Sequence, residues 1–263
     1  MGKHNSSSTR VVPVFDKLFA SDPSGASWLD ALIELGSRHE IVSTISGGQR
    51  LVPGHRRCWG MEEIALPAPE SLLEYLVQNI SFAQVNASKK KGDTLVKRTA
   101  LASRDPAIVA EALATLRSGK RGRKWFVLEG ESRPDAFLET EQLVICIEGK
   151  RTERTCTTHT TWMPRRSQLV RHMDAARDAY PGKRVLGLLI VEGDGSRADA
   201  VAPSASWCAE SAAQYAPKML RDSLPHRSDV ERAEIEAGIL GVTTWQAVCA
   251  RNHLPWPPAP DPI

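Results

Sequence analysis

Apolar residues occur along this chain both in short consecutive runs and at the spacing of a helical turn, and together these patterns predict a protein with helices and buried strands. Leu143–Ile147 (LVICI) is apolar at consecutive positions and rich in β-branched residues, which is typical of a strand buried on both faces. The segment 183–191 (KRVLGLLIV) has the same character and predicts another buried strand. Shorter apolar pieces at 125–128 and 136–138 predict two strands that precede the first buried run.

Helices are predicted where apolar residues recur at a spacing of one helical turn between capping and stop signals. The segment from Asp105 to Ser118 is the clearest, because Asp105 suits an N-cap, Pro106 suits the first turn and Gly119 follows. The same criteria predict helices over Ser27–Leu35, Pro69–Ile80 and Arg165–Ala179, and in the tail over Glu210–Leu220, Ser228–Ile239 and Thr244–Asn252.

The order of these elements from 105 to 191 is helix, three strands, helix, strand. We therefore expect an α/β core over residues 101–200. Residues 1–100 form an N-terminal extension, which is either separate or part of the same domain. Residues 201–263 form a helical C-terminal region with a proline-rich end (PWPPAPDPI).

Composition narrows the class of protein without naming a function. A hydrophobic content of 41% and a charged content of 25% are ordinary for a soluble globular chain, and a formal net charge of +3 permits a nucleic-acid partner without arguing for one. The five cysteines form no CxxC pair, which disfavours a zinc knuckle or a disulfide framework. We expect no membrane contact and a cytoplasmic location, because the chain shows neither a long apolar run nor the apolar core of a signal peptide.

Candidate chemistry gathers around the first buried strand. Because side chains alternate along a strand, Glu148 and Lys150 leave the same face at its end, where charge is costly unless it is paired or bound to a metal. Asp135 follows Pro134, and its distance along the chain from Glu148 fits a strand, a tight turn and a return strand. If these strands pair, two carboxylates and one ammonium group converge at one edge of the sheet.

Two neighbouring carboxylates repel each other unless a cation lies between them, and hard oxygen ligands suit Mg²⁺ or Mn²⁺. Such an ion lowers the pKa of a bound water and neutralises charge that develops on a phosphate. Lys150 beside it could orient or deprotonate that water. The pattern therefore indicates metal-assisted hydrolysis of a phosphodiester.

The pair of motifs Pro134-Asp135 and Glu148-Gly149-Lys150, within this order of elements, resembles the PD-(D/E)XK nuclease superfamily, which has the restriction-endonuclease-like fold. The resemblance covers about residues 105–191. It implies an αβββαβ core with a mixed central sheet flanked by helices. It also implies a Mg²⁺- or Mn²⁺-dependent deoxyribonuclease that leaves a 5′-phosphate.

The resemblance also assigns roles to single residues. It implies that Asp135 and Glu148 hold the metal and that Lys150 assists the nucleophile. Many members add a carboxylate from the first helix, for which Glu111 is the candidate, and a polar residue from the second helix, for which Gln168 is the best match. The predicted partner is DNA, and a homodimer is compatible with the sequence.

Other interpretations of the same residues stay open. A nucleic-acid-binding or assembly module can keep this fold without cleaving its partner. Glu148 and Lys150 can instead be a surface ion pair of an unrelated α/β domain. By their context we expect Glu129 to be an exposed loop acid, His172 to lie on a helix flank without a catalytic part, and Gly149 to mark a bulge or the close approach of a nucleic acid.

Overall fold

The structure is a computed structural model, and it describes residues 7–119, 125–151, 157–158, 162–163, 166–194 and 197–258. Arg165 and Arg166 begin the helix predicted over Arg165–Ala179, where the backbone N–H groups of the first turn favour a phosphate. Arg165 lies outside the described residues.

A four-stranded mixed sheet with the strand order β1-β2-β5-β6 forms the centre of the molecule. β1 (Ala136–Glu139) runs antiparallel to β2 (Leu143–Gly149), whereas β5 (Arg184–Val191) and β6 (Ile239–Thr244) run parallel to it. β3 (Thr157–Thr158) and β4 (Arg166–Ser167) pair in a separate small sheet. The strands predicted over 136–138, 143–147 and 183–191 are confirmed, and so is the α/β class.

β2 is buried along its whole length because both faces of the sheet are covered. Leu143, Ile145 and Ile147 belong to one hydrophobic cluster, and Val144 and Cys146 belong to the cluster on the opposite face. This alternation confirms the expected division of the strand. It also places Glu148, two positions after Cys146, on the side of the second cluster.

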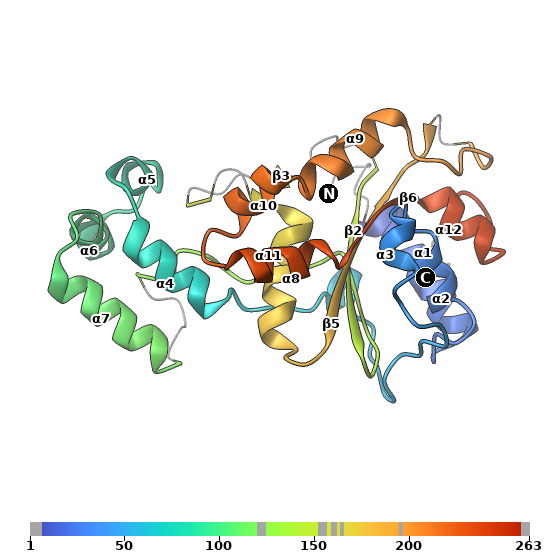
Figure 1. The fold of residues 1–263 in the computed structure, drawn as a ribbon, viewed down its shortest axis with the longest axis horizontal. Coiled ribbons are helices and arrows are strands. Elements are labelled where there is room, and N and C mark those ends of the chain that lie inside the picture. The colour runs from blue at the N-terminus through green and yellow to red at the C-terminus, as the bar shows by residue number, and fades with distance from the viewer. Residues whose placement is uncertain are drawn as a thin grey trace.

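The first face of the sheet is covered by the N-terminal segment together with the last helix, so segments far apart in sequence lie side by side (Figure 1). Aromatic residues fill this layer: Phe15 packs against Trp59 and, edge to face, against Trp245. The elements are η1 (Ser7–Val11), α1 (Val12–Ser21), α2 (Leu29–Glu34), α3 (His39–Val42) and α12 (Trp245–Arg251).

The second face is covered by α8 (Gln168–Ala179), α10 (Pro217–Ser223) and α11 (Asp229–Glu236) (Figure 1). α9 (Ala205–Gln214) contributes Trp207 to a small cluster with Leu189, Val191 and Val242 of β5 and β6. Ser167 caps α8 by accepting a hydrogen bond from the amide of Val170, which fixes the point at which the helix begins.

A helical lobe, which we define as residues 67–131, projects from the body on the side of α8 (Figure 1). It has a hydrophobic core of its own, built from the apolar stripes of its helices together with Phe126, Leu128 and Met163. The chain enters the lobe after η2 (Gly60–Glu62) and leaves it before β1. The helices are α4 (Glu70–Asn79), α5 (Phe82–Ala87), α6 (Gly92–Ala102) and α7 (Pro106–Arg117).

The two linkers of the lobe pair with each other where they meet the body. Leu66 and Ser132 form an antiparallel bridge, with amide-to-carbonyl distances of 2.8 Å and 2.7 Å in the two directions. The chain therefore passes from the body to the lobe and back through one pair of adjacent segments.

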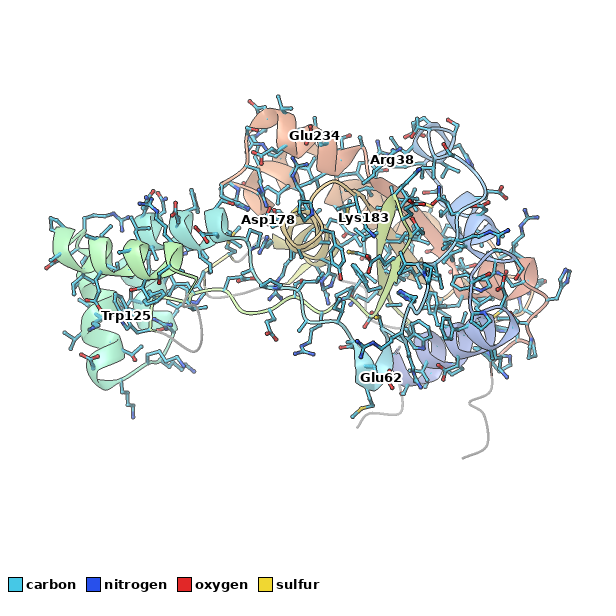
Figure 2. All side chains as sticks on the ribbon, turned by 90° about the horizontal axis from the view of Figure 1, so that it is seen from below. Arg38, Glu62, Trp125, Asp178, Lys183 and Glu234 are labelled. Carbon is cyan, nitrogen blue, oxygen red and sulfur yellow. The ribbon has the colours of Figure 1, made fainter. Side chains whose placement is uncertain are left out.

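The lobe corrects part of the predicted core. Residues 125–128 form no strand, because Phe126 and Leu128 pack into the lobe and the carbonyl of Trp125 accepts a hydrogen bond from Arg98; Figure 2 shows Trp125 within the lobe, away from the sheet. The helix predicted from Asp105 to Ser118 forms, but as α7 of the lobe. The expected boundary between residues 100 and 101 falls inside α6.

The C-terminal region also differs from the prediction, because it adds a strand to the central sheet. The helices expected near 210–220, 228–239 and 244–252 form, with α9 and α10 sharing the first of these regions. Between them, Ile239–Thr244 runs as β6 beside β5, a strand that the sequence analysis did not predict. Among the described residues, no helix combines the length and the apolar character that crossing a membrane requires.

Gly149 ends β2 at a point where other parts of the protein come very close. A Cβ atom there would lie 2.8 Å from Cζ2 of Trp245 and 2.9 Å from Cγ2 of Val11, distances that real Cβ contacts do not reach. Packing inside the protein thus explains this glycine, and the expected approach of a nucleic acid is not needed.

We expect Gly149→Ala to lower the free energy of unfolding by about 1–3 kcal/mol, because the added methyl group must displace Trp245 or Val11. Urea denaturation measures the loss. Gly130→Ala is the matched control, since a Cβ atom there meets nothing within 4 Å. Equal stability of the two variants would contradict the packing argument.

Candidate active site

The hairpin of β1 and β2 brings Asp135 to Glu148. Ala136 is the register partner of Ile147, so the next position outward places Asp135 opposite Glu148. Oδ2 of Asp135 accepts a hydrogen bond of 2.8 Å from the amide of Gly149, which ties the carboxyl group to the end of β2. The structure thus brings together the two acids that the sequence singled out.

Glu148 is a buried carboxylate, with only 1% of its surface exposed. One oxygen lies 2.6 Å from Nζ of Lys150, and the other lies 3.0 Å from Nε2 of His172. Burial works against ionisation, but the hydrogen bond from His172 and the charge of Lys150 outweigh it and hold the pKa of Glu148 below its ordinary value. The Glu148–Lys150 pair is therefore an interior ion pair rather than the surface pair of the open alternative.

Both the backbone and the side chain of Lys150 are held by hydrogen bonds. Its amide donates to the carbonyl of Ile190 on β5, and its carbonyl accepts from the indole nitrogen of Trp245. Its side chain reaches Oε1 of Gln168 at 3.2 Å. Gln168 is the first residue of α8, so the predicted contribution from this helix lies at the site.

His172 is part of the site, contrary to the expectation that it lies on a helix flank without a role there. It is 2% exposed and bridges two residues, since its Nδ1 lies 2.6 Å from Oγ of Ser132 and its Nε2 contacts Glu148. An ionised carboxylate can only accept, so Nε2 carries the proton donated to Glu148, and in the neutral ring Nδ1 accepts from Ser132. Gln168 and His172 are one helical turn apart, which was the available sequence signal.

Asp135 has a strongly perturbed pKa. Burial of its carboxyl group, followed by the negative charge of Glu148, raises the pKa from 3.8 to about 8. The hydrogen bond from Gly149 and the charge of Lys150 only partly oppose this shift. At neutral pH and without a bound cation, Asp135 therefore holds a proton next to an ionised Glu148.

Glu63 is a third carboxylate at this edge, and the sequence analysis did not find it. Burial, opposed in part by Arg133 and reinforced by Glu148, raises the pKa of Glu63. The charge of Glu63 in turn raises the pKa of Asp135. Glu63 lies in an irregular segment before the lobe, so no periodicity or motif could have connected it to Asp135.

Glu111, the predicted carboxylate from the first helix, lies elsewhere. It is on α7 of the lobe, where it pairs with Lys97 at 3.0 Å on a partly exposed surface. A helix with a good apolar stripe was correctly predicted there, but its stripe packs into the lobe core and not against the sheet. Glu111 is therefore not positioned to share a metal with Asp135 and Glu148.

Two further expectations for charged residues are corrected by a buried ionic network. Glu129, expected to be an exposed loop acid, is 3% exposed and pairs with Arg166 and Arg171. Arg166, considered for phosphate contact at the start of the helix, is 1% exposed and also bonds to Asp174. These charges neutralise one another. They connect the last part of the lobe, at Glu129, to the start of α8.

Another buried ion pair lies at the ends of β2 and β5. The guanidinium group of Arg10 binds both carboxylate oxygens of Glu192, at 2.8 Å and 2.9 Å, and Arg151 contacts the same carboxylate at 3.2 Å. Glu192 follows directly after the apolar run of β5, as Glu148 ends that of β2. It anchors the N-terminal segment at the edge of the sheet that carries Asp135 and Glu148.

Two features indicate that a divalent cation fits between Asp135 and Glu148. The charge of Glu148 helps to keep Asp135 protonated, which a cation between them would reverse. Oε1 of Glu148 is buried without an aligned hydrogen bond, although Lys150 lies close to it. Among the described residues, no group of three or more acidic, histidine or cysteine side chains stands ready to hold a metal. A magnesium ion bound by Asp135 and Glu148 would thus keep several waters, as Mg²⁺ commonly does.

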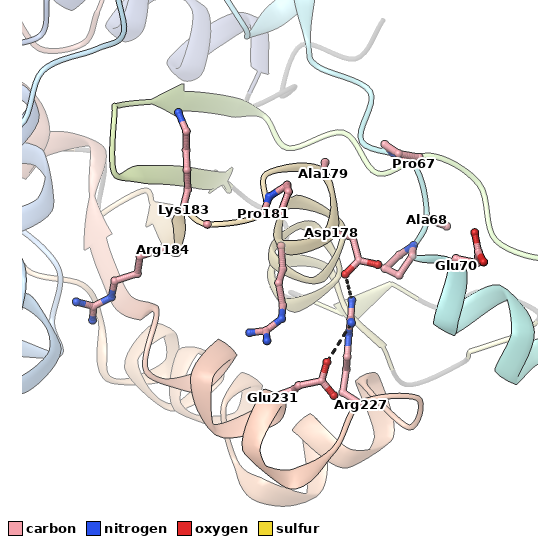
Figure 3. A pocket seen from close by; sticks show the side chains of 13 residues that line it. Pro67, Ala68, Glu70, Asp178, Ala179, Pro181, Lys183, Arg184, Arg227 and Glu231 are labelled. Carbon is pink, nitrogen blue, oxygen red and sulfur yellow. Dashed lines mark hydrogen bonds and ion pairs between the residues drawn. The ribbon is translucent and has the colours of Figure 1, made fainter. Parts of the chain in front are cut away.

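A cavity of about 810 Å³ lies away from these residues. It is lined by the end of α8, the start of β5 and the entry to α4, so it lies at the other end of α8 from Gln168. Figure 3 shows Arg227 on the wall of this cavity between Asp178 and Glu231, and Arg227 forms an ion pair with each of them. Arg227 is therefore neutralised by two acids of the same wall, and we assign the cavity no part in the chemistry.

No protein-family model matches the chain, and neither a curated protein nor a solved structure shows a match to it. The resemblance to the PD-(D/E)XK superfamily thus stays a prediction from the residues.

The raised pKa of Asp135 predicts a specific pH dependence of stability. The folded metal-free protein favours the protonated acid, so its contribution to stability is full below the ordinary pKa of 3.8 and is lost as pH rises through about 8. The slope is at most about 1.4 kcal/mol per pH unit. We expect Asp135→Asn, which cannot ionise, to lack this loss.

Urea denaturation of wild type and Asp135→Asn across this pH range, in the presence of EDTA, measures the effect. Titrating groups that do not interact with Asp135 cancel in the difference between the two proteins. Parallel curves would show that the pKa of Asp135 is not raised by folding.

Proposed function

We propose that this protein is a metal-dependent nuclease that hydrolyses phosphodiester bonds in DNA. The observation that carries the proposal is the convergence of Asp135, Glu148, Lys150 and Gln168 at one edge of the sheet, where the charge of Glu148 raises the pKa of Asp135. These are the residue types that the resemblance to the PD-(D/E)XK superfamily predicts for hydrolysis with Mg²⁺ or Mn²⁺. The choice of DNA as the substrate also comes from that resemblance.

Each residue has a task that its contacts support. Asp135 and Glu148 would hold the ion, which when bound supplies positive charge at the scissile phosphate and lowers the pKa of a coordinated water. The Lys150 ammonium, 3.2 Å from Gln168, is placed to orient that water and to stabilise charge on the phosphate. Gln168 fixes the position of Lys150. The buried surroundings strengthen these charge interactions, because little water screens them.

A non-catalytic nucleic-acid-binding or assembly module is the second candidate. It is favoured by one observation, namely that both oxygens of Glu148 already have neighbours, Lys150 and His172. In that case the Glu148–Lys150 pair stabilises the end of β2 and no cleavage occurs. The two functions differ in whether the wild-type protein breaks the chain that it binds.

Cleavage of plasmid and single-stranded DNA with Mg²⁺ or Mn²⁺ tests the proposal. We expect wild type to cleave, and Asp135→Ala and Lys150→Ala to lose activity by about 100-fold or more, because one loses a metal ligand and the other the positive charge beside the water. Lys183→Ala is the matched control. Lys183 pairs with Glu139 at 2.6 Å at the opposite end of the sheet, and its loss changes the net charge equally.

The outcomes separate the candidates. Equal cleavage by all four proteins indicates a contaminating nuclease, and binding without cleavage by wild type favours the non-catalytic module.

Glu63 provides a further test of the acidic edge. Because its charge acts on Asp135 and Glu148, Glu63→Gln should weaken the binding of Mn²⁺ by about tenfold. Isothermal titration calorimetry measures the affinity. Glu62→Gln is the control, since Glu62 is the exposed neighbour and loses the same charge; equal weakening in both variants would point to net charge alone.

A further inference from the structure

The deepest part of the candidate site is a chain of hydrogen bonds with no direct access to substrate. It runs from Glu148 through His172 to Ser132, and all three residues are at most 2% exposed. Neither Ser132 nor His172 can touch a nucleic acid. Any effect they have on chemistry must pass through Glu148.

This series of hydrogen bonds continues into the two linkers of the helical lobe. The hydroxyl of Ser132 is hydrogen-bonded to Nδ1 of His172, and its backbone forms the two-way bridge with Leu66. The metal-binding carboxylate and the attachment of the lobe are thus separated by two side chains. The neighbouring Arg171 binds the carbonyl of Glu131 and pairs with Glu129. His172 is the side chain that contacts both Ser132 and Glu148.

We propose that Ser132 and His172 are positioning residues that fix the carboxylate of Glu148 for a divalent cation and couple the metal site to the linkers of the helical lobe. The inference rests on the proposed function, because it assigns these residues to the same metal site. A ligand whose outer oxygen is held by a fixed donor loses little freedom when an ion binds, so the ion binds more tightly. By linkage, an ion that tightens this contact also stabilises the Leu66–Ser132 bridge.

Binding of Mn²⁺, measured by calorimetry and by its paramagnetic resonance signal, tests the positioning role without any requirement for cleavage. We expect His172→Leu, which fills the space but cannot donate, to weaken binding by about 10- to 100-fold. Ser132→Ala, which leaves Nδ1 of His172 without its donor, should weaken it by a smaller factor. His172→Gln should recover part of the affinity, because its amide can donate to Glu148.

His226→Leu is the matched control. His226 is also a buried histidine bound to a carboxylate, Asp174, but that pair belongs to the ionic network behind α8. Its substitution is expected to lower stability and leave the affinity for Mn²⁺ unchanged. Thermal unfolding followed by circular dichroism establishes which variants fold; if His172→Leu does not, Ser132→Ala decides.

Hydrogen exchange tests the coupling. In wild type, saturating Mg²⁺ should slow exchange of the amides at positions 66 and 132 by at least about fivefold. In Ser132→Ala, whose backbone bridge is intact, this slowing should disappear. A merely structural role of Ser132 would change the basal rate and not its response to the ion.

The outcomes distinguish a failure of the proposed metal site from a failure of the positioning role. If wild type binds no divalent cation, the proposed function fails and the positioning role with it. If wild type binds Mn²⁺ and Asp135→Ala does not, the site stands; unchanged affinity in folded Ser132→Ala and His172→Leu then overturns the positioning role alone. Failure of His172→Gln to recover affinity, or an equal response of exchange in wild type and Ser132→Ala, likewise overturns it.

Discussion

The structure depends on keeping one carboxylate charged in the interior. Glu148 ends a strand that is covered on both faces, where an unpaired charge would cost about 3–5 kcal/mol. Lys150, directly after the strand, and His172 from α8 each lie against one of its oxygens, so the sheet edge and the first half of α8 meet at this carboxylate. The contact of His172 ties α8 to the end of β2, and Gln168 lies one turn earlier on the same helix.

The residues at the site show which kinds of information the sequence contains. Asp135, Glu148 and Lys150 were predictable because they lie on one hairpin, whose register follows from local alternation. Gln168 was predictable from helical periodicity together with the resemblance. Glu63 was not, since it lies in an irregular segment far away in sequence and acts on the site through its charge.

The errors have a common physical origin. An apolar stripe shows that a helix buries one face, but it does not reveal which core that face enters, so α7 and Glu111 were assigned to the sheet when they belong to the lobe. The strand β6 was missed for a related reason. Three helices separate it in the chain from its partner β5, and Gly241 interrupts the apolar run that would have indicated a buried strand.

The pairing of Leu66 with Ser132 gives the helical lobe the character of an insertion. Every strand of the central sheet, the helices on both of its faces, and Asp135, Glu148, Lys150 and Gln168 are encoded outside residues 67–131. During divergence, such a segment can be lengthened, shortened or exchanged while the sheet keeps its register. The preference for a particular partner and the chemistry at the sheet edge can therefore evolve at different rates, provided that the two residues at the junction continue to pair.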